Sequence, residues 1–244
     1  MYKFDRREEV HLITRGTSFN ELGILAVASD AIKRIDPFLK VGATITYCLG
    51  ARQDRVTHSG VPLTAKVVAE FINSMMLDFV NILHPHSDVF PSLLHDCNIM
   101  DHERYIYRAM EELKPDSIII PDAGVSKSIH KFLDKHPGLE SIQCLKRRNV
   151  NTGILRDIQI LGDVVDKRCL IVDDICDGGK TFIELAKQLR LKGASAVGLY
   201  VTHGIFSKGF DDLKTDISKI YCTDSYSNHE DRDYDFVELF PLTF

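Results

Sequence analysis

The sequence predicts an α/β protein built from two similar halves, each with a mostly parallel sheet flanked by helices. Short apolar runs alternate with stretches of helical periodicity, which is the pattern of parallel sheets covered on both faces. Polar and glycine-rich segments follow the ends of the apolar runs and not their beginnings, as expected where ligands bind beyond the carboxyl ends of parallel strands. A chain of 244 residues is long enough for two domains of roughly 100–120 residues.

The first half, residues 1–95, is predicted to alternate three strands with two helices. Apolar residues recur at helical spacing in 21–35 and again in 63–76, so both segments are predicted to be amphipathic helices. The boundary with the second half is expected in the 90–100 stretch, which breaks this rhythm. The three strands are expected at 10–14, 43–48 and 79–83.

The second half, residues 96–244, continues the alternation. Gly193 fits the C-terminal cap of a helix that begins near residue 182. A long polar loop is expected after residue 145, and a polar loop over 224–235 precedes a last strand that could return to the first half. The other helices are expected near 101–113 and 125–135, and the strands at 117–121, 141–145, 169–173 and 196–201.

The composition excludes several classes of protein. The formal net charge is −5, whereas a general nucleic-acid binder usually carries a basic surplus. No apolar run approaches the length of about 18 residues that indicates a transmembrane helix, and the first residues have no apolar signal region. The six cysteines form no CxxC pair, which is typical of reduced thiols in a cytoplasmic protein. We therefore expect a cytoplasmic protein with neither nucleic acid nor membrane as a partner.

The segment IVDDICDGGKTF, residues 171–182, carries the strongest chemical signal. An apolar strand delivers Asp173 and Asp174 to its end, two glycines follow, and a helix is expected to begin near Thr181. Backbone N–H groups of such a loop and of the helix N-terminus form a cradle for an anion. The paired carboxylates can accept hydrogen bonds from a vicinal diol. A diol beside a phosphate describes a ribose 5-phosphate moiety, whereas an acidic helix-capping turn is the simpler alternative.

A Walker-type nucleotide loop ending in Gly179-Lys180-Thr181 is a rival interpretation of the same segment. That motif requires a glycine five residues before Gly179. The residue there is Asp174, so the Walker interpretation fails.

The segment 171–182 resembles the phosphoribosyl-pyrophosphate loop that type I phosphoribosyltransferases share with ribose-phosphate pyrophosphokinases. The resemblance implies two type I phosphoribosyltransferase-like domains. ARQDR, followed by VPLTAKVVAEF, resembles the ATP-binding loop and helix of the pyrophosphokinases, which the transferases lack. The resemblance runs from about residue 9 to about residue 224. Further segments that match in order are FVNILHPHSD, IIPDAG, LKRRN, GDVVDKRCLIVDD and YVTHGIFSKG.

This resemblance implies an Mg²⁺-dependent diphosphokinase that moves the β,γ-diphosphoryl group of ATP to an anomeric hydroxyl and releases AMP. Negative charge spreads over the phosphoryl oxygens in the transition state, so positioned cations supply most of the catalysis. His84 and His203 are more plausible as structural residues than as metal ligands. The implied roles are catalysis for Lys146 and Arg148; ATP binding for Arg52, Gln53 and Asp54; ribose-phosphate binding for Asp173, Asp174, Asp177, Gly178, Gly179, Lys180 and Thr181; and Mg²⁺ binding for His86 and Asp122.

The chain also departs from the family pattern. The family's N-terminal Phe-Ser-Asp-Gly-Glu element and its C-terminal helix are not found in this sequence. Val56, Thr57 and His58 stand where the family has basic residues after ARQDR. The phosphate loop has Gly178 in place of a threonine and Lys180 in place of a glycine. With these differences, the sequence resembles compact bacteriophage members of the family, which use ADP-ribose as the acceptor in NAD⁺ synthesis. The acceptor is therefore expected to be ADP-ribose or ribose 5-phosphate, and the family implies a homo-oligomer, a dimer or higher.

Two other classes of function stay open. A non-catalytic regulatory relative would lose catalytic groups, whereas Lys146, Arg148, His86 and Asp122 are all present. A plain phosphoribosyltransferase would have no use for the ARQDR loop. The diphosphokinase is the preferred interpretation.

Overall fold

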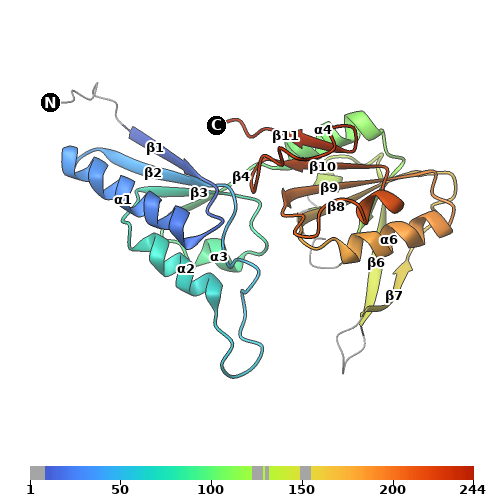
Figure 1. The fold of residues 1–244 in the computed structure, drawn as a ribbon, viewed down its shortest axis with the longest axis horizontal. Coiled ribbons are helices and arrows are strands. Elements are labelled where there is room, and N and C mark those ends of the chain that lie inside the picture. The colour runs from blue at the N-terminus through green and yellow to red at the C-terminus, as the bar shows by residue number, and fades with distance from the viewer. Residues whose placement is uncertain (1–8, 123–128, 130–131, 149–154) are drawn as a thin grey trace. The chain divides into compact units, whose positions relative to one another are not determined.

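The computed structural model describes residues 9–122, 129, 132–148 and 155–244. The chain divides into two compact units, Met1–Asp101 and His102–Phe244, shown in blue to green and in green to red in Figure 1. The division falls later than the expected one after residue 95. The reason is that Cys97–Met100 forms a strand that pairs with Phe79–Leu83 in the first sheet.

The first unit contains a four-stranded sheet in the order β1-β2-β3-β4, and all of its neighbouring strands run parallel. Helix α1 begins where the side chain of Ser18 accepts a hydrogen bond from the Glu21 N–H, which is a common N-terminal cap. The elements are β1 Glu9–Thr14, α1 Phe19–Ile35, β2 Lys40–Ile45, α2 Thr64–Asn73, β3 Phe79–Leu83, α3 Val89–Ser92 and β4 Cys97–Met100.

The core of the first unit lies between the sheet and helices α1 and α2. Leu22 of α1 and Val68 of α2 pack in one cluster with Ala43 and Ile45 of β2. Because successive side chains of a strand point to opposite faces, Thr44 belongs to the other face. There it is buried beneath a hydrogen-bonded row of polar side chains. Both helices therefore cover the same face of β2, whereas the sequence predicted cover on both faces.

The second unit contains a seven-stranded sheet in the order β11-β10-β9-β8-β5-β6-β7. The neighbours are parallel except β6 and β7, which run antiparallel. Strand β8 is central in this sheet, and its burial is nearly continuous. The elements are α4 Glu103–Leu113, β5 Ser117–Ile120, β6 Glu140–Arg148, β7 Leu155–Ile160, β8 Arg168–Cys176, α6 Lys180–Leu191, β9 Ala196–Gly204, η1 Leu213–Thr215, β10 Lys219–Thr223 and β11 Val237–Phe240.

Two apolar clusters cover the two faces of the second sheet. Helix α6 contributes Phe182 and Leu185 to one cluster, and α4 contributes Tyr105 and Ile106 to the other. The second unit therefore has three layers, with α6 and α4 on opposite faces of β8 and β9 (Figure 1). Of the helix predicted over 125–135, residues 129 and 132–134 are helical and residue 135 is in a turn, whereas 125–128, 130 and 131 lie outside the described residues.

Strand β6 continues beyond residue 145, where the sequence predicted a polar loop. Lys146 pairs with Ile158, and Arg148 pairs with Leu155, in the antiparallel ladder with β7. The buried Ile158 and Ile160 explain this extension. Both side chains belong to the apolar cluster on one face of the sheet, so their burial holds β7 in place, and β7 gives β6 a partner for its backbone groups.

The last strand also differs from the expectation, because β11 does not return to the first unit. It pairs in parallel with β10. Val237 and Phe240 are buried, and the Phe240 ring stacks with the rings of Tyr105 and Tyr221. Burial of these apolar side chains holds β11 in the second sheet.

Among the helices in the described ranges, none has both the length and the apolar character that a membrane crossing needs.

Candidate functional site

In the first unit, the loop after β2 presents two candidate ATP-binding side chains. Arg52 and Gln53 are exposed. The Gln53 N–H donates to the Gly50 carbonyl oxygen at 2.9 Å, and the Gln53 carbonyl oxygen accepts from the Ala65 N–H at 3.2 Å. The loop is thereby fixed to the first turn of α2, and the Gln53 side chain also accepts a hydrogen bond from the Thr64 hydroxyl.

Asp54 connects this loop to the one that follows β3. Its side chain is only 4 % exposed and accepts a hydrogen bond from Arg55 Nε at 3.0 Å. Burial alone would raise the pKa of Asp54. Hydrogen bonds from Arg55 and Ser87 and the positive charges of Arg55 and His86 outweigh burial, so the pKa lies below its ordinary value. The structure thus brings the predicted ATP loop close to His86, and Asp54 acts as the connection between the two loops.

The two histidines after β3 differ in environment. His84 is buried and has a left-handed φ of 38°, whereas His86 is exposed. The burial of His84 fits the structural role that the sequence favoured for it, and His86 is the histidine that a ligand can reach.

In the second unit, three carboxylates gather at the carboxyl ends of β5 and β8. Asp122 follows β5, and Asp173 and Asp174 are buried near the end of β8. The Asp174 N–H donates to Asp173 Oδ1 at 2.8 Å. Burial, then the charge of Asp174, and also the charge of Asp122 raise the pKa of Asp173 well above its ordinary value. Burial and the neighbouring carboxylates therefore disfavour the ionised form of Asp173.

A divalent cation suits this carboxylate group. The described residues include no set of three His, Cys, Asp or Glu side chains arranged to hold a metal ion. Mg²⁺ commonly binds through one or two carboxylates together with waters and substrate phosphates, so a complete protein cage is not required. Asp122 offers the oxygen chemistry that Mg²⁺ prefers, and the second candidate ligand, His86, belongs to the first unit.

The candidate phosphate loop, Asp177–Thr181, connects β8 to α6. Gly179 is the N-cap residue of α6, with φ 72° and no capping side chain. A Cβ on Gly179 would lie 3.0 Å from Leu213 Cδ2, so the position suits glycine on both counts. The Phe182 N–H already donates to the Gly179 carbonyl oxygen at 2.9 Å. Because no side chain caps α6, the earlier N–H groups, those of Lys180 and Thr181, are the ones suited to bind an anion.

The candidate catalytic residues Lys146 and Arg148 lie on β6. This strand pairs with β5, whose carboxyl end leads to Asp122. The backbone therefore places the basic segment on the strand next to the one that delivers a predicted metal ligand.

The sequence interpretation missed a contact from the loop after β9. Ser207 Oγ donates a hydrogen bond to Asp177 Oδ1 at 2.6 Å. The segment YVTHGIFSKG was recognised only as a matching segment, with no role for its serine. Its histidine, His203, is buried and hydrogen-bonded through Nδ1 to Ser225 Oγ at 2.8 Å, which fits the structural role expected for it.

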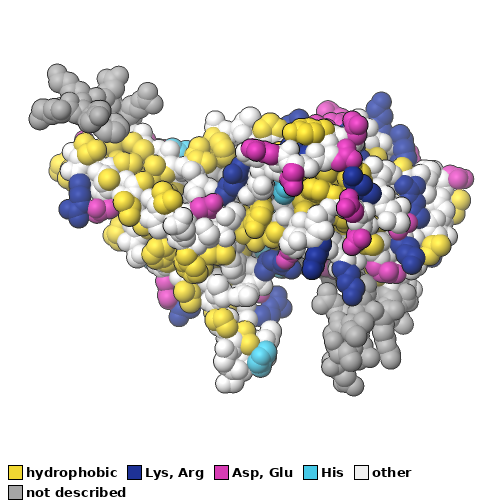
Figure 2. Space-filling model, in the orientation of Figure 1, with side chains coloured by type: hydrophobic (Ala, Val, Ile, Leu, Met, Phe, Trp, Pro, Cys, Tyr) yellow, Lys and Arg dark blue, Asp and Glu magenta, His cyan; other side chains and the backbone are white. Residues whose placement is uncertain are grey.

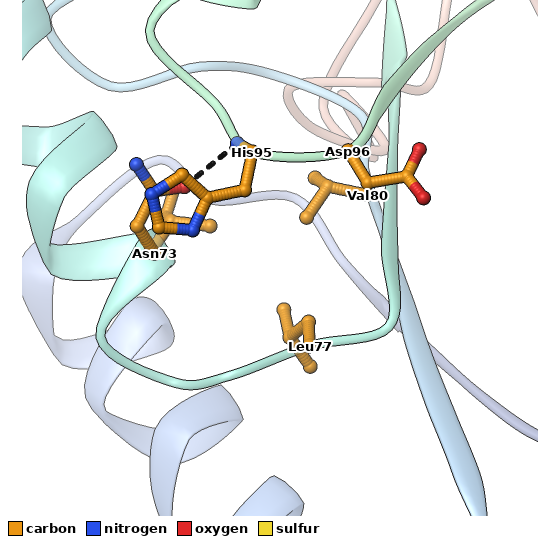
Figure 3. Close-up of a pocket in the computed structure, with 6 residues that line it drawn as sticks. Asn73, Leu77, Val80, His95 and Asp96 are labelled. Atoms are coloured by element: carbon orange, nitrogen blue, oxygen red, sulfur yellow. Dashed lines mark hydrogen bonds between the residues drawn. The ribbon is translucent and has the colours of Figure 1, made fainter.

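A shallow hollow in the first unit lies at the end of its sheet opposite the loop that carries Arg52 and Gln53. It is lined where α2 ends and where β3 and β4 begin, and Figure 3 shows its side chains. Asn73 Oδ1 accepts from the His95 N–H at 3.1 Å, and Asn73 Nδ2 donates to the Leu93 carbonyl oxygen at 2.9 Å. Asn73 thus joins the end of α2 to the segment before β4, which is a structural role.

Comparisons with known proteins identify relatives of this chain in sequence and in fold. The family described as "Phosphoribosyl transferase domain" matches residues 130–236. A ribose-phosphate pyrophosphokinase from Maricaulis maris is 30 % identical over 234 residues, covering 90 % of this chain and 73 % of the relative. One from Nitrosomonas europaea is 32 % identical over 225 residues, covering 85 % and 66 %. The crystal structure of phosphoribosylpyrophosphate synthetase from Mycobacterium smegmatis has a similar fold, with a TM-score of 0.79 at 22 % identity, over 96 % of this chain and 77 % of that one.

Proposed function

Because the chain belongs to the ribose-phosphate pyrophosphokinase family, we propose that it transfers the β,γ-diphosphoryl group of ATP to the anomeric hydroxyl of a ribose 5-phosphate moiety. The chain is a diphosphotransferase. AMP is the second product in this proposal, and Mg²⁺ is required.

The observation that carries the proposal is the continuity of the acceptor site along one strand, loop and helix. Strand β8 delivers Asp173 and Asp174, and Gly179 then opens the first turn of α6 to an anion. The two carboxylates accept hydrogen bonds from the ribose hydroxyls, while the loop N–H groups and Thr181 hold the 5-phosphate. This pairing orients the anomeric hydroxyl for attack, and orientation is a large part of catalysis in phosphoryl transfer.

The donor side uses the exposed Arg52 and Gln53 to bind ATP. Asp54 acts as the positioning residue, since it joins this loop to Ser87. Lys146 and Arg148 supply positive charge to the transferring phosphoryl oxygens; arginine offers a bidentate fork and lysine a mobile point charge. His86 and Asp122 are the proposed protein ligands that would hold Mg²⁺, and the ion would supply charge neutralisation to the phosphates when bound.

The acceptor is either ADP-ribose or ribose 5-phosphate. Gly178 lacks the hydroxyl donor that suits a phosphomonoester dianion, and the exposed Lys180 adds a cation. Both features support an acceptor whose phosphate continues into a pyrophosphate, as in ADP-ribose. A product of that kind, ADP-ribose 1-pyrophosphate, would place the protein in NAD⁺ synthesis and in a bacteriophage setting.

We include two further parts in this proposal, a cytoplasmic location and a homo-oligomer. The six cysteines are free, which supports a reducing compartment. Burial raises the pKa of Cys176 and of Cys222 to about 12, so these two thiols stay protonated and unreactive. Apolar side chains gather over α1 in Figure 2. Among them, Ile24, Val27 and Ile35 are each more than half exposed, which supports contact with a second copy.

An assay of AMP release tests the reaction. The purified protein is incubated with ATP and Mg²⁺, and with ribose 5-phosphate, ADP-ribose or neither. We expect AMP in equal amount to a 1-pyrophosphorylated product with at least one acceptor, and only background AMP without an acceptor. If neither acceptor yields AMP above background, the diphosphokinase is excluded and a non-catalytic regulatory relative is favoured.

The control variant for this assay is Lys146→Ala. Loss of a cation that acts in the transition state should lower kcat by about 10²-fold or more and leave acceptor affinity nearly unchanged. An unchanged kcat would remove Lys146 from the catalytic role.

A further inference from the structure

Two loops meet at the candidate phosphate site, and only one of them has been assigned a role. The loops follow the neighbouring parallel strands β8 and β9, which end side by side with Cys176 opposite Gly204. The Cys176 carbonyl oxygen accepts hydrogen bonds from the Ile205 N–H at 2.8 Å and from the Phe206 N–H at 3.1 Å. The second loop, Ile205–Gly209, is thereby fixed to the residue that precedes the phosphate loop.

Ser207 acts on the one carboxylate of the phosphate loop. An aspartate at this position would repel a bound phosphate if its carboxylate faced the anion. Ser207 Oγ donates to Asp177 Oδ1 at 2.6 Å, a short bond of the kind found with ionised acceptors. This bond orients the Asp177 carboxylate towards Ser207, so that its charge is engaged by a donor.

Lys208 lies against the position where the phosphate loop has no side chain. A Cβ on Gly178 would lie 3.6 Å from Lys208 Cγ, so the aliphatic stem of Lys208 passes beside this glycine. Both residues are exposed, and the lysine ammonium stands at the end of a flexible stem with three donors. Lys180 is exposed at the first residue of α6. The glycine pair of the loop therefore has one lysine beside Gly178 and another directly after Gly179.

We propose that the loop Ile205–Gly209 forms the second wall of the acceptor-phosphate site. In this site, Lys208 binds the phosphoryl group on ribose C5, and Ser207 is a positioning residue that holds Asp177. The proposal rests on the proposed function of residues 177–181 and assigns roles to two residues that have none so far. The lysine at 208 takes over the donor function that Gly178 cannot supply. The ligand chemistry is a phosphoryl group on ribose C5, which ribose 5-phosphate and ADP-ribose share.

The test of Lys208 compares Lys208→Met with Lys187→Met. Methionine keeps an unbranched stem beside Gly178 and removes the charge, and Lys187 is an exposed lysine of α6 outside the loop. We expect Lys208→Met to raise the KM for the acceptor about tenfold, as for one lost hydrogen bond to a charged group, with the KM for ATP unchanged. Lys187→Met should match the wild type. Equal acceptor KM values in both variants would overturn the role of Lys208.

Running both acceptors distinguishes the source of the phosphoryl group. An increase in KM with ribose 5-phosphate places Lys208 on the first phosphate. An increase confined to ADP-ribose would overturn that placement, because a contact with the shared phosphoryl group must affect both acceptors.

The test of Ser207 uses Ser207→Ala and Ser207→Thr. Alanine frees the Asp177 carboxylate, so the acceptor KM should rise severalfold, whereas threonine keeps the hydroxyl and should restore it. A purely structural role would change the melting temperature and leave the acceptor KM unchanged, and that result would overturn the positioning role.

Calorimetric binding of ribose 5-phosphate and of ADP-ribose to the ATP-free protein separates this inference from the proposed reaction. If the wild type binds an acceptor but releases no AMP, the proposed reaction fails. Weaker binding by Lys208→Met than by Lys187→Met would still support the second wall. If the wild type turns over and both lysine variants behave alike, the reaction stands and the second wall fails.

Discussion

Asp173 combines a proposed binding role with a buried carboxyl group that costs stability. Its carboxylate is buried beside Asp174, and its pKa is raised by burial first and by the neighbouring carboxylates next. Such a group resists ionisation in the free protein and is stabilised when ribose hydroxyls or a cation approach. Groups whose pKa is strongly shifted by their surroundings are common in binding sites.

We predict that Asp173→Asn stabilises the ligand-free protein and abolishes turnover. Asparagine keeps an oxygen that can accept from the Asp174 N–H, and it removes a carboxyl group whose ionisation is opposed by the folded protein and not by the unfolded chain. At pH 7.5, the free energy of unfolding should rise by about 1 kcal/mol, and the melting temperature by about 3 °C. Thermal unfolding without ligand and the AMP assay together measure both effects.

The pH dependence of this gain has a definite sign. Because the folded-state pKa of Asp173 is raised, the wild type is most stable below the unfolded pKa and loses stability as the pH rises through the folded value. The difference between variant and wild type should therefore shrink as the pH falls. Asp231→Asn, which removes an exposed carboxylate, should show no such gain. A destabilised Asp173→Asn at pH 7.5 would contradict the explanation.

Single residues also show where sequence reasoning succeeds and where it fails. Asp173 and Asp174 could be placed at the carboxyl end of a strand, because strand, loop and helix follow one another along the chain. The approach of Asp54 to Ser87 and the bond from Ser207 to Asp177 could not be predicted. Each joins loops from different strands and depends on the register between those strands, which local patterns do not encode.

At the scale of elements, the long periodic segments were the easiest to predict. Helices α1 and α6 begin and end close to their expected bounds, since their apolar faces repeat over several turns. Strands β4 and β10 were missed. Each is short, and each forms because a neighbouring strand supplies backbone partners. The expected loop after residue 145 failed for the same reason, because β7 converts it into a strand.

The junction of α2 with the segment before β4 provides a prediction at this scale. Asn73→Ala removes two hydrogen bonds, one to the Leu93 carbonyl oxygen and one from the His95 N–H, which Figure 3 shows. We expect the first unit to lose about 1–2 kcal/mol of stability. Because this junction lies at the end of the sheet opposite the candidate ATP loop, the KM values for ATP and the acceptor should stay unchanged. Chemical denaturation and steady-state kinetics measure the two quantities.

The matched control for this junction is Asn98→Ala. Asn98 is exposed and donates only a long hydrogen bond of 3.4 Å to Asn81 Oδ1, so its loss should cost less than about 0.5 kcal/mol. If Asn73→Ala is no less stable than Asn98→Ala, the junction does not stabilise the first unit.

At the scale of the whole molecule, the two units divide the chemistry between them. The first unit carries the exposed Arg52 and Gln53 together with His86, and the second carries the carboxylates and the phosphate loop. Each set stands beyond the carboxyl ends of parallel strands, as the alternating pattern predicted. The sequence could nominate these residues as candidates because each motif is continuous along the chain. The first unit extends to Asp101, beyond the expected boundary after residue 95, because β4 belongs to the first sheet.

The apolar stripe on α1, defined as Ile24, Val27 and Ile35, leads to the last prediction. These residues fall on one side of the helix and are 63 %, 72 % and 59 % exposed. Charges on the last turns of α1 are paired, Asp30 with Arg34 on the same helix and Lys33 with Asp78 before β3. The stripe therefore presents an apolar surface without a net charge, which suits a second copy of the same chain. We expect the wild type to form a homo-oligomer and Val27→Glu to shift it to smaller species.

Light scattering after size exclusion measures this assembly over a range of protein concentrations. The variant should keep its fold, because Val27 is already in contact with water, and its circular dichroism should match the wild type. Phe38→Glu is the control: Phe38 is 95 % exposed but lies beyond the end of α1, so its replacement should leave the molar mass unchanged. A wild type that stays monomeric at every concentration, or a Val27→Glu variant with the wild-type mass, would show that α1 does not carry the interface. An equal loss of mass in both variants would indicate a general effect of added charge, because only Val27 belongs to the stripe.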